Sequence, residues 1–306
     1  MRSRKKNFTP DALQHIYQRN IDCGVIFYTM EDRLVYYTTA AVNAVKHEIV
    51  VYAGAIMFTH IHQSCQAKSK KQLESYLHDT DTSFARAYNH KYQRHGKLFR
   101  EKPGIAQKKS DKDKRTNIIY VLNNHVEKKL CQTASDEQWC FLAYALSESP
   151  FSVPIQNPSP ALRQAMALVD RRKRRNQILR YKDLHRIFQV LDDTEKKQFI
   201  DYTIVKYAWV NHRATMSFFG DMDALLVALN STTGSEYGQK EDYYNAPDTP
   251  FVSLIKMAES QAFLKRIYTL DKEEKADLII KAANLPSVRV SHLTRFFHQE
   301  IVTKNL

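Results

Sequence analysis

The 306-residue sequence lacks paired cysteine motifs and long apolar runs. Its four cysteines (Cys23, Cys65, Cys131 and Cys140) show no C-x-x-C spacing, so neither a zinc site nor a disulfide framework is indicated. No apolar run approaches the ~18 residues of a membrane-spanning helix. The basic start, Met-Arg-Ser-Arg-Lys-Lys, is not followed by the apolar region of a signal peptide. These absences predict a cytoplasmic protein with reduced thiols.

Basic residues are in clear excess over acidic ones. The net charge is +13 and the isoelectric point is near 9.4, while 43% hydrophobic and 26% charged residues are typical of a globular chain. Residues 86–115 hold 11 basic and 3 acidic side chains, a net charge of +8, and Tyr88, Tyr92, His95 and Phe99 are interspersed among them. Basic side chains bind phosphates and aromatic rings stack on unpaired bases, so this combination favours a single-stranded nucleic acid as partner. The alternative is a solvated lysine-rich surface that binds nothing.

The candidate nucleic-acid contacts in this segment are Arg86, Asn89, Lys91, Tyr92, Arg94, Lys97, Arg100, Lys102, Lys108, Lys109 and Arg115.

An H-x-H pattern lies near the end of the apolar stretch 49–65, where His60 and His62 flank Ile61. Alternate side chains of a β-strand share a face, so both imidazoles would point the same way while Ile61 faces the core. Two neighbouring imidazoles are half of a site for a divalent metal, and the alternative is a pair of exposed edge histidines. We expect the stretch to be one long strand or two strands bent near Gly54.

A second chemical pattern lies in residues 116–130, which we expect to form a helix with Thr116 as its N-cap. Tyr120 stands one turn before Asn124, so both side chains would lie on one face of this helix. If that face packs on the strand of His60 and His62, the Tyr120 phenol and the Asn124 amide would lie beside the two imidazoles. Asn124 as a third ligand and Asn124 as a helix cap both remain open.

Three blocks of sequence resemble the single-tyrosine HUH transposases, and the REP-associated group in particular. Met57–His62 (Met-Phe-Thr-His-Ile-His) is similar to M-P-D-H-I-H, and Tyr120–Val126 (Tyr-Val-Leu-Asn-Asn-His-Val) is similar to Y-I-x-x-N-P-V. Between them, residues 87–99 are similar to a family segment that ends in G-x-L-[FW]. The blocks occur in the family's order, and the sequence departs from it at Phe58-Thr59, where Pro-Asp is usual, and at His125, where Pro is usual.

The resemblance implies a ferredoxin-like antiparallel sheet in an α+β HUH nuclease domain. It implies Tyr120 as the catalytic nucleophile and Mg²⁺ or Mn²⁺ held by His60, His62 and Asn124. The implied activity is nicking and strand transfer of single-stranded or hairpin DNA through a 5′-phosphotyrosine, as in DNA transposition and recombination. The alternative is a non-cleaving DNA or RNA hairpin-binding protein derived from such a transposase. Whether the protein is a monomer or a homodimer stays open.

Prolines divide the chain. Pro150, Pro154, Pro158 and Pro160 cluster in residues 149–160, which predicts a linker between a nuclease domain (1–148) and an all-α domain (161–306) that few contacts would connect. The second part has no motif that carries chemistry. Its basic run 171–175 is either a solvated helix face or a contact to DNA backbone.

Further helices are expected over 31–46, 69–95, 135–146 and 194–210, with a loop or edge hairpin at 100–114 and a polar loop at 231–249. Helices over 271–283 and 291–302 form either a helix-turn-helix or a plain hairpin. In the first case the DNA-reading residues would be Arg289, Ser291, His292, Arg295 and His298.

Overall fold

The computed structural model describes residues 8–10, 12–231 and 246–301. The first part of the chain forms a four-stranded sheet and three helices in the order β1 (Leu13–Arg19), α1 (Met30–Lys46), β2 (Val50–Ile56), β3 (His60–Gln66), α2 (Lys70–Tyr92), β4 (Gly104–Lys108) and α3 (Asp111–Glu127). The strand order is β2-β3-β1-β4 and every neighbouring pair is antiparallel. This β-α-β-β-α-β arrangement is the ferredoxin-like topology, so the predicted fold class is confirmed.

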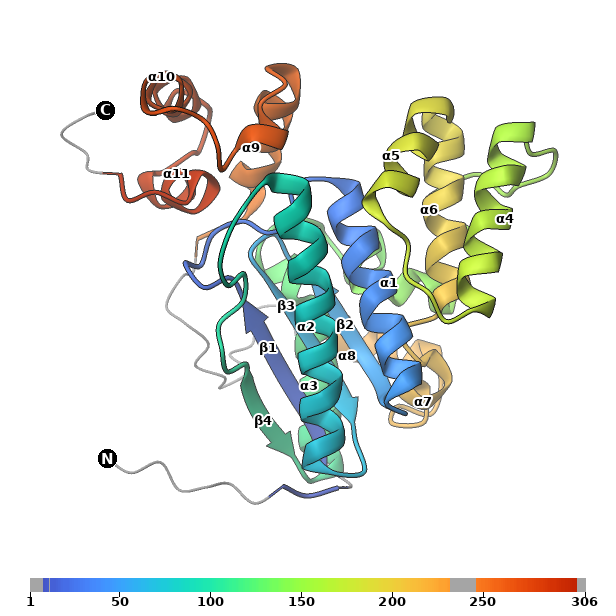
Figure 1. Cartoon of the computed structure of the whole chain (residues 1–306). Coiled ribbons are helices and arrows are strands. Elements are labelled where there is room, and N and C mark those ends of the chain that lie inside the picture. Colours follow the sequence, from blue (N-terminus) through green and yellow to red (C-terminus); the bar gives the residue numbers. More distant parts are fainter. Residues whose placement is uncertain (1–7, 11, 232–245, 302–306) are drawn as a thin grey trace, which may run out of the picture.

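Helices cover both faces of the sheet. Strand residues such as Ile16 and Ile61 share one hydrophobic cluster with α1 and α2, which lie in front of the sheet in Figure 1. Leu13 and Ala53 belong to a second cluster with α3, on the opposite face. Because strand side chains alternate, His60 and His62 lie on the α3 face while Ile61 lies on the α1–α2 face.

Three local features differ from those expected. The bend in the 49–65 stretch falls at residues 57–59, between β2 and β3, rather than at Gly54. Helix α3 begins at Asp111 with Ser110 as its N-cap, and the Ser110 hydroxyl accepts a hydrogen bond from the Asp113 amide at 3.1 Å. Thr116 therefore lies inside the helix and does not cap it. The segment 135–146 forms three short 3₁₀ turns, η1 (Ala134–Asp136), η2 (Gln138–Cys140) and η3 (Leu142–Ala145), instead of one helix.

The second part of the chain is helical in all its described elements. These are α4 (Pro160–Arg174), α5 (Tyr181–Val190), α6 (Asp193–Tyr207), α7 (His212–Met216), α8 (Met222–Ser231), α9 (Thr249–Ser260), η4 (Leu264–Arg266), α10 (Lys272–Ala283) and α11 (Val290–Phe297). Helices α4, α5 and α6 stand together beside α1, whereas α9, α10 and α11 gather near the end of the sheet where β3 begins (Figure 1). Most of the polar loop predicted at 231–249 lies outside the described residues.

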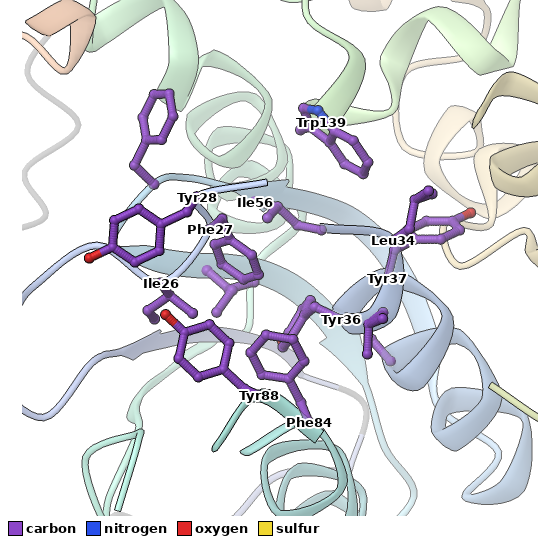
Figure 2. Packing of buried hydrophobic residues seen from close by; sticks show 14 of the residues in the cluster. Ile26, Phe27, Tyr28, Leu34, Tyr36, Tyr37, Ile56, Phe84, Tyr88 and Trp139 are labelled. Atoms are coloured by element: carbon purple, nitrogen blue, oxygen red, sulfur yellow. The ribbon is translucent and has the colours of Figure 1, made fainter. Parts of the chain in front are cut away.

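Many contacts cross residues 149–160, so the expectation that few contacts would do so is wrong. The Tyr37 hydroxyl donates to the Ile204 carbonyl at 2.6 Å, and Trp209 is buried against Tyr36 and Tyr37 of α1. Figure 2 shows the buried aromatic side chains around which the first part is built, among them Tyr36 and Tyr37. One hydrophobic cluster runs from Ile16 to Phe297. The domain boundaries themselves remain a prediction.

Helix α11 is anchored by its inward face, while Arg289 and Ser291 at its start are exposed. His292 is buried and lies 3.1 Å from the Pro247 carbonyl, and His298 lies 2.7 Å from both Asp22 and the Tyr28 hydroxyl. Two of the residues predicted to read DNA in a helix-turn-helix are thus used for internal packing. In the described ranges, no helix combines the length and the apolar character needed to cross a membrane.

Candidate active site

The two histidines of the H-x-H pattern lie side by side on β3. The centroids of the His60 and His62 rings are 4.8 Å apart, and both side chains are buried on the α3 face. Ile61 between them is buried in the opposite cluster with α1 and α2. The prediction that both imidazoles share one face of the strand, with Ile61 on the other, is therefore confirmed.

Helix α3 brings Tyr120 to these histidines. The ring centroid of Tyr120 is 5.6 Å from that of His62, and the two rings meet edge to face. Tyr120 is carried by the same helix as Ile118 and Val121, which are fully buried and hold α3 against the sheet. A phenol and an imidazole pair from distant segments thus meet in one buried cluster.

Two further aromatic residues of the cluster come from β1 and were not among the predicted site residues. Tyr17 is paired with His62 across the β1–β3 ladder, and its ring centroid lies 4.9 Å from His62 and 5.1 Å from His60. His15 stacks on His62 at 5.5 Å and meets Tyr120 edge to face at the same centroid distance. The alternation of Leu13, His15 and Tyr17 is visible in the sequence, but the register that places them opposite β3 is not.

Hydrogen bonds at Nδ1 orient both rings of the pair. His62 Nδ1 lies 3.2 Å from His15 Nε2, and His60 Nδ1 lies 2.8 Å from the Thr59 hydroxyl. In the tautomer in which each Nδ1–H donates, the lone pair of His60 and of His62 is on Nε2. The Thr59 hydroxyl and the His15 ring can each donate or accept, so these contacts orient the two rings without fixing their tautomers.

The surroundings keep both imidazoles neutral. Burial holds the pKa of His60 well below its usual value, and the positive charges of Lys128, Arg295 and Arg19 lower it further. Burial also holds the pKa of His62 well below its usual value, with His60 and His15 contributing. Neutral imidazoles are the form that binds metal.

The donor set fits the implied Mg²⁺ or Mn²⁺ only in part. The described residues include no group of three His, Cys, Asp or Glu side chains arranged to hold a metal ion. Asn124 is buried one turn after Tyr120, and its amide nitrogen donates to the Tyr120 carbonyl at 2.8 Å, so its oxygen is the atom suited to ligation. His60, His62 and Asn124 would therefore supply two nitrogen atoms and one oxygen atom.

The C-terminal helices reach the same end of the sheet. The Asp248 amide, just before α9, donates to the Lys128 carbonyl at 3.1 Å, and Arg295 on α11 is close enough to His60 to lower its pKa. Burial raises the pKa of Asp248 to about 6. Only 7% of the Tyr120 surface and 1% of the His62 surface are exposed. The structure therefore describes a closed site.

The predicted nucleic-acid residues divide into an exposed and an internal group. The exposed side chains are Arg86, Lys97, Arg100, Lys102, Lys109 and Arg115, and Lys108 is half-buried on the edge strand β4.

The internal group stabilises the end of α2. The Asn89 amide nitrogen donates to the Gly96 carbonyl at 2.8 Å, and Arg94 donates to the Asn89 side-chain oxygen at 3.1 Å. The Lys91 ammonium and the Tyr92 hydroxyl each bind the buried Asp32 carboxylate at 2.8 Å.

The ring of Tyr92 is fully buried, as is that of Tyr88, so neither offers a face to a base. The prediction that Tyr92 and Lys91 contact nucleic acid is therefore wrong, because both are engaged with Asp32 inside the protein.

Comparison with known proteins gives one distant structural match. No family model and no curated protein matches the chain. A solved structure of a REP-associated tyrosine transposase bound to a REP hairpin is similar with a TM-score of 0.41 and 11% sequence identity, over 52% of this chain and 93% of that one. This likeness is too distant to indicate the function of the chain.

Proposed function

We propose that the protein is a metal-dependent enzyme that nicks single-stranded or hairpin DNA and transfers the strand through a 5′-phosphotyrosine. The observation that carries the proposal is the meeting of Tyr120 with the histidine pair, at 5.6 Å between the ring centroids of Tyr120 and His62. A buried phenol beside two oriented, neutral imidazoles suits phosphoryl transfer to tyrosine better than a purely structural contact.

In the proposed reaction the Tyr120 oxygen attacks the scissile phosphorus. The bond from phosphorus to the 3′ oxygen breaks, the phenol loses its proton, and the departing 3′ oxygen takes up a proton. His60 and His62, with the Asn124 oxygen, would hold Mg²⁺ or Mn²⁺, which supplies Lewis-acid polarisation of the phosphate when bound. Because the new phosphodiester to tyrosine retains the energy of the old one, rejoining to another 3′ hydroxyl needs no nucleotide cofactor.

The electrostatic surroundings support a phosphate as the substrate group. Three positive charges lower the pKa of His60. They are those of Lys128 at the end of α3, Arg295 on α11 and Arg19 on β1. Exposed cations, such as Lys102 between α2 and α3 and Arg115 in the second turn of α3, would track the flanking backbone. A single strand or a hairpin is the proposed partner because the backbone must extend to reach a tyrosine inside the cluster.

The second candidate is a non-cleaving protein that binds a DNA or RNA hairpin. The low exposure of Tyr120 favours it, because a nucleophile must reach phosphorus, and α9–α11 lie at this end of the sheet. The two candidates differ in whether a covalent protein–DNA adduct forms.

Tyr120→Phe provides the test, because it removes only the phenolic oxygen. With a labelled hairpin oligonucleotide and Mn²⁺, we expect the wild-type protein to yield an adduct on a denaturing gel and Tyr120→Phe to yield none. DNA affinity should change by less than about twofold.

Tyr17→Phe is the matched control, because Tyr17 lies as close to the histidine pair. An adduct that persists in Tyr120→Phe and is lost in Tyr17→Phe would move the nucleophile to Tyr17. Absence of any adduct with the wild-type protein, together with intact hairpin binding, would support the non-cleaving candidate.

A further inference from the structure

A second concentration of positive charge lies on α4 and α5, away from the candidate active site. Residues 161–190 contain nine Lys or Arg and two Asp, so their net charge of +7 is about half of the +13 of the whole chain. Figure 1 places this helix pair beside α1, on the side of the molecule away from α2 and β4. This charge lies outside the 86–115 segment.

Both acidic residues of the segment are engaged internally. Asp183 forms an ion pair with Arg172 at 2.8 Å, and Asp170 accepts a hydrogen bond from the Tyr202 hydroxyl at 2.8 Å. Lys173 is internal as well, because its ammonium donates to the Tyr207 carbonyl. The surface of the helix pair therefore presents cations without neighbouring acids from its own sequence.

The remaining cations are exposed. They are Arg163, Arg171, Arg174, Arg175, Arg180, Lys182 and Arg186. Within the described part of the chain, no ion pair involves any of them.

Helical spacing groups several of these side chains on common helix faces. Arg171, Arg174 and Arg175 share one face of α4, and Lys182 and Arg186 share one face of α5. Arg171 and Arg186 line the same groove between the two helices. From Arg163 to Arg175 the cations extend over about 18 Å of helix, the length of about five base steps of duplex DNA.

We propose that the α4–α5 surface binds the phosphate backbone of duplex DNA, such as the stem of a hairpin substrate. The inference rests on the proposed function only in taking DNA as the partner. A protein partner fits less well, because protein interfaces need an apolar, charge-poor centre. The groove does expose apolar surface, chiefly at Val190, but Arg171 and Arg186 line it as well, so its centre is not free of charge.

The experiment uses the full-length chain with Arg171, Arg175 and Arg186 changed to Gln. We expect affinity for a blunt 20-base-pair duplex to fall at least about tenfold at moderate salt. The slope of log affinity against log salt should decrease in magnitude by about 2 to 3, since each phosphate contact contributes about 0.9. Affinity for an unstructured oligothymidine of equal length should change by less than about twofold.

The control variant removes the same charge elsewhere, by changing the exposed Lys256, Lys265 and Lys272 to Gln. Unchanged duplex affinity in the arginine variant would overturn the proposal and leave the surface to an acidic protein partner. An equal loss in the control variant, or an equal loss for oligothymidine, would overturn it as well. Because only binding is measured, the result is independent of covalent chemistry, and failure of Tyr120 to form an adduct would not affect it.

Discussion

Trp209 is the residue whose removal most directly tests whether the two parts of the chain fold as one unit. Its ring is 3% exposed, lies against Tyr36, Tyr37 and Phe141, and donates from Nε1 to the Tyr76 hydroxyl at 3.2 Å. A buried Trp→Ala change costs about 3–5 kcal/mol through lost contacts and the cavity left behind. That is a large share of the ~5–15 kcal/mol that stabilises a typical domain.

Urea unfolding followed by tryptophan fluorescence measures this cost. The chain has two tryptophans, so in Trp209→Ala the signal comes only from Trp139, which lies in the predicted nuclease part. With an m-value of about 3 kcal/mol/M, a loss of 4 kcal/mol lowers the midpoint by about 1.3 M. If the Trp139 midpoint moved by less than about 0.3 M, the two parts would unfold independently and the shared-core argument would fail. Trp209→Phe keeps most of the ring volume and serves as the control.

Gly54 extends the same test. A methyl group on Gly54 would lie 2.6 Å from Cζ3 and 2.9 Å from Cη2 of Trp209, too close for a ring held on several sides. Gly54→Ala alone should therefore cost about 1–3 kcal/mol. In the Trp209→Ala background the methyl group has room, so the same change should cost almost nothing. Additive costs in the double variant would mean that Trp209 does not limit the space at Gly54.

The remaining predictions concern the histidine cluster and Lys91. His60→Ala and His62→Ala should each abolish cleavage, and His15→Ala should weaken Mn²⁺ binding about 10–100-fold by releasing the His62 ring. Because the pKa values of His60 and His62 lie well below 6.5, Mn²⁺ affinity measured by calorimetry should hold nearly constant from about pH 7.5 to 6, and a steep fall there would show that the rings titrate normally. Lys91→Gln should lower stability, since it leaves the buried Asp32 carboxylate without its cation, yet leave the salt dependence of DNA binding unchanged. A smaller slope of log DNA affinity against log salt in Lys91→Gln would show that Lys91 does contact DNA phosphate.

Local signals in the sequence predict the helices of the first part well. Helix α1 begins after Thr29, whose hydroxyl accepts from the Asp32 amide while the Asp32 carboxylate accepts from the Thr29 amide, and this capping box precedes an apolar helical stripe. The common face of His60 and His62 follows from the period of a strand alone. Gly54 was misread as a bend because its role is not local: it makes room for Trp209, a residue that no local pattern connects to it.

Burial at the end of α2 could not be predicted for the same reason. Lys91 and Tyr92 have the composition of a nucleic-acid contact, but α1 and α5 meet them there, and the Tyr181 hydroxyl joins them on Asp32 at 2.9 Å. His15 and Tyr17 were missed because only the β1–β3 register places them at the site. Neighbouring residues in the sequence therefore predict the helices and strands, whereas tertiary contacts decide which residues belong to the site.

The charges around His60 lead to a last prediction about how metal and DNA would bind. Lys128, Arg295 and Arg19 all disfavour positive charge at His60, and the described residues offer no three-carboxylate or three-histidine cage to offset them. A divalent cation alone should therefore bind weakly, whereas a DNA phosphate beside it would bring the missing negative charge. Because such coupling is reciprocal, an oligonucleotide should tighten Mn²⁺ binding by the same factor as Mn²⁺ tightens oligonucleotide binding. Calorimetric titrations of Tyr120→Phe, which prevents turnover, with each ligand in the absence and presence of the other measure both factors. Equal Mn²⁺ affinity with and without DNA would mean that metal and phosphate do not share this site.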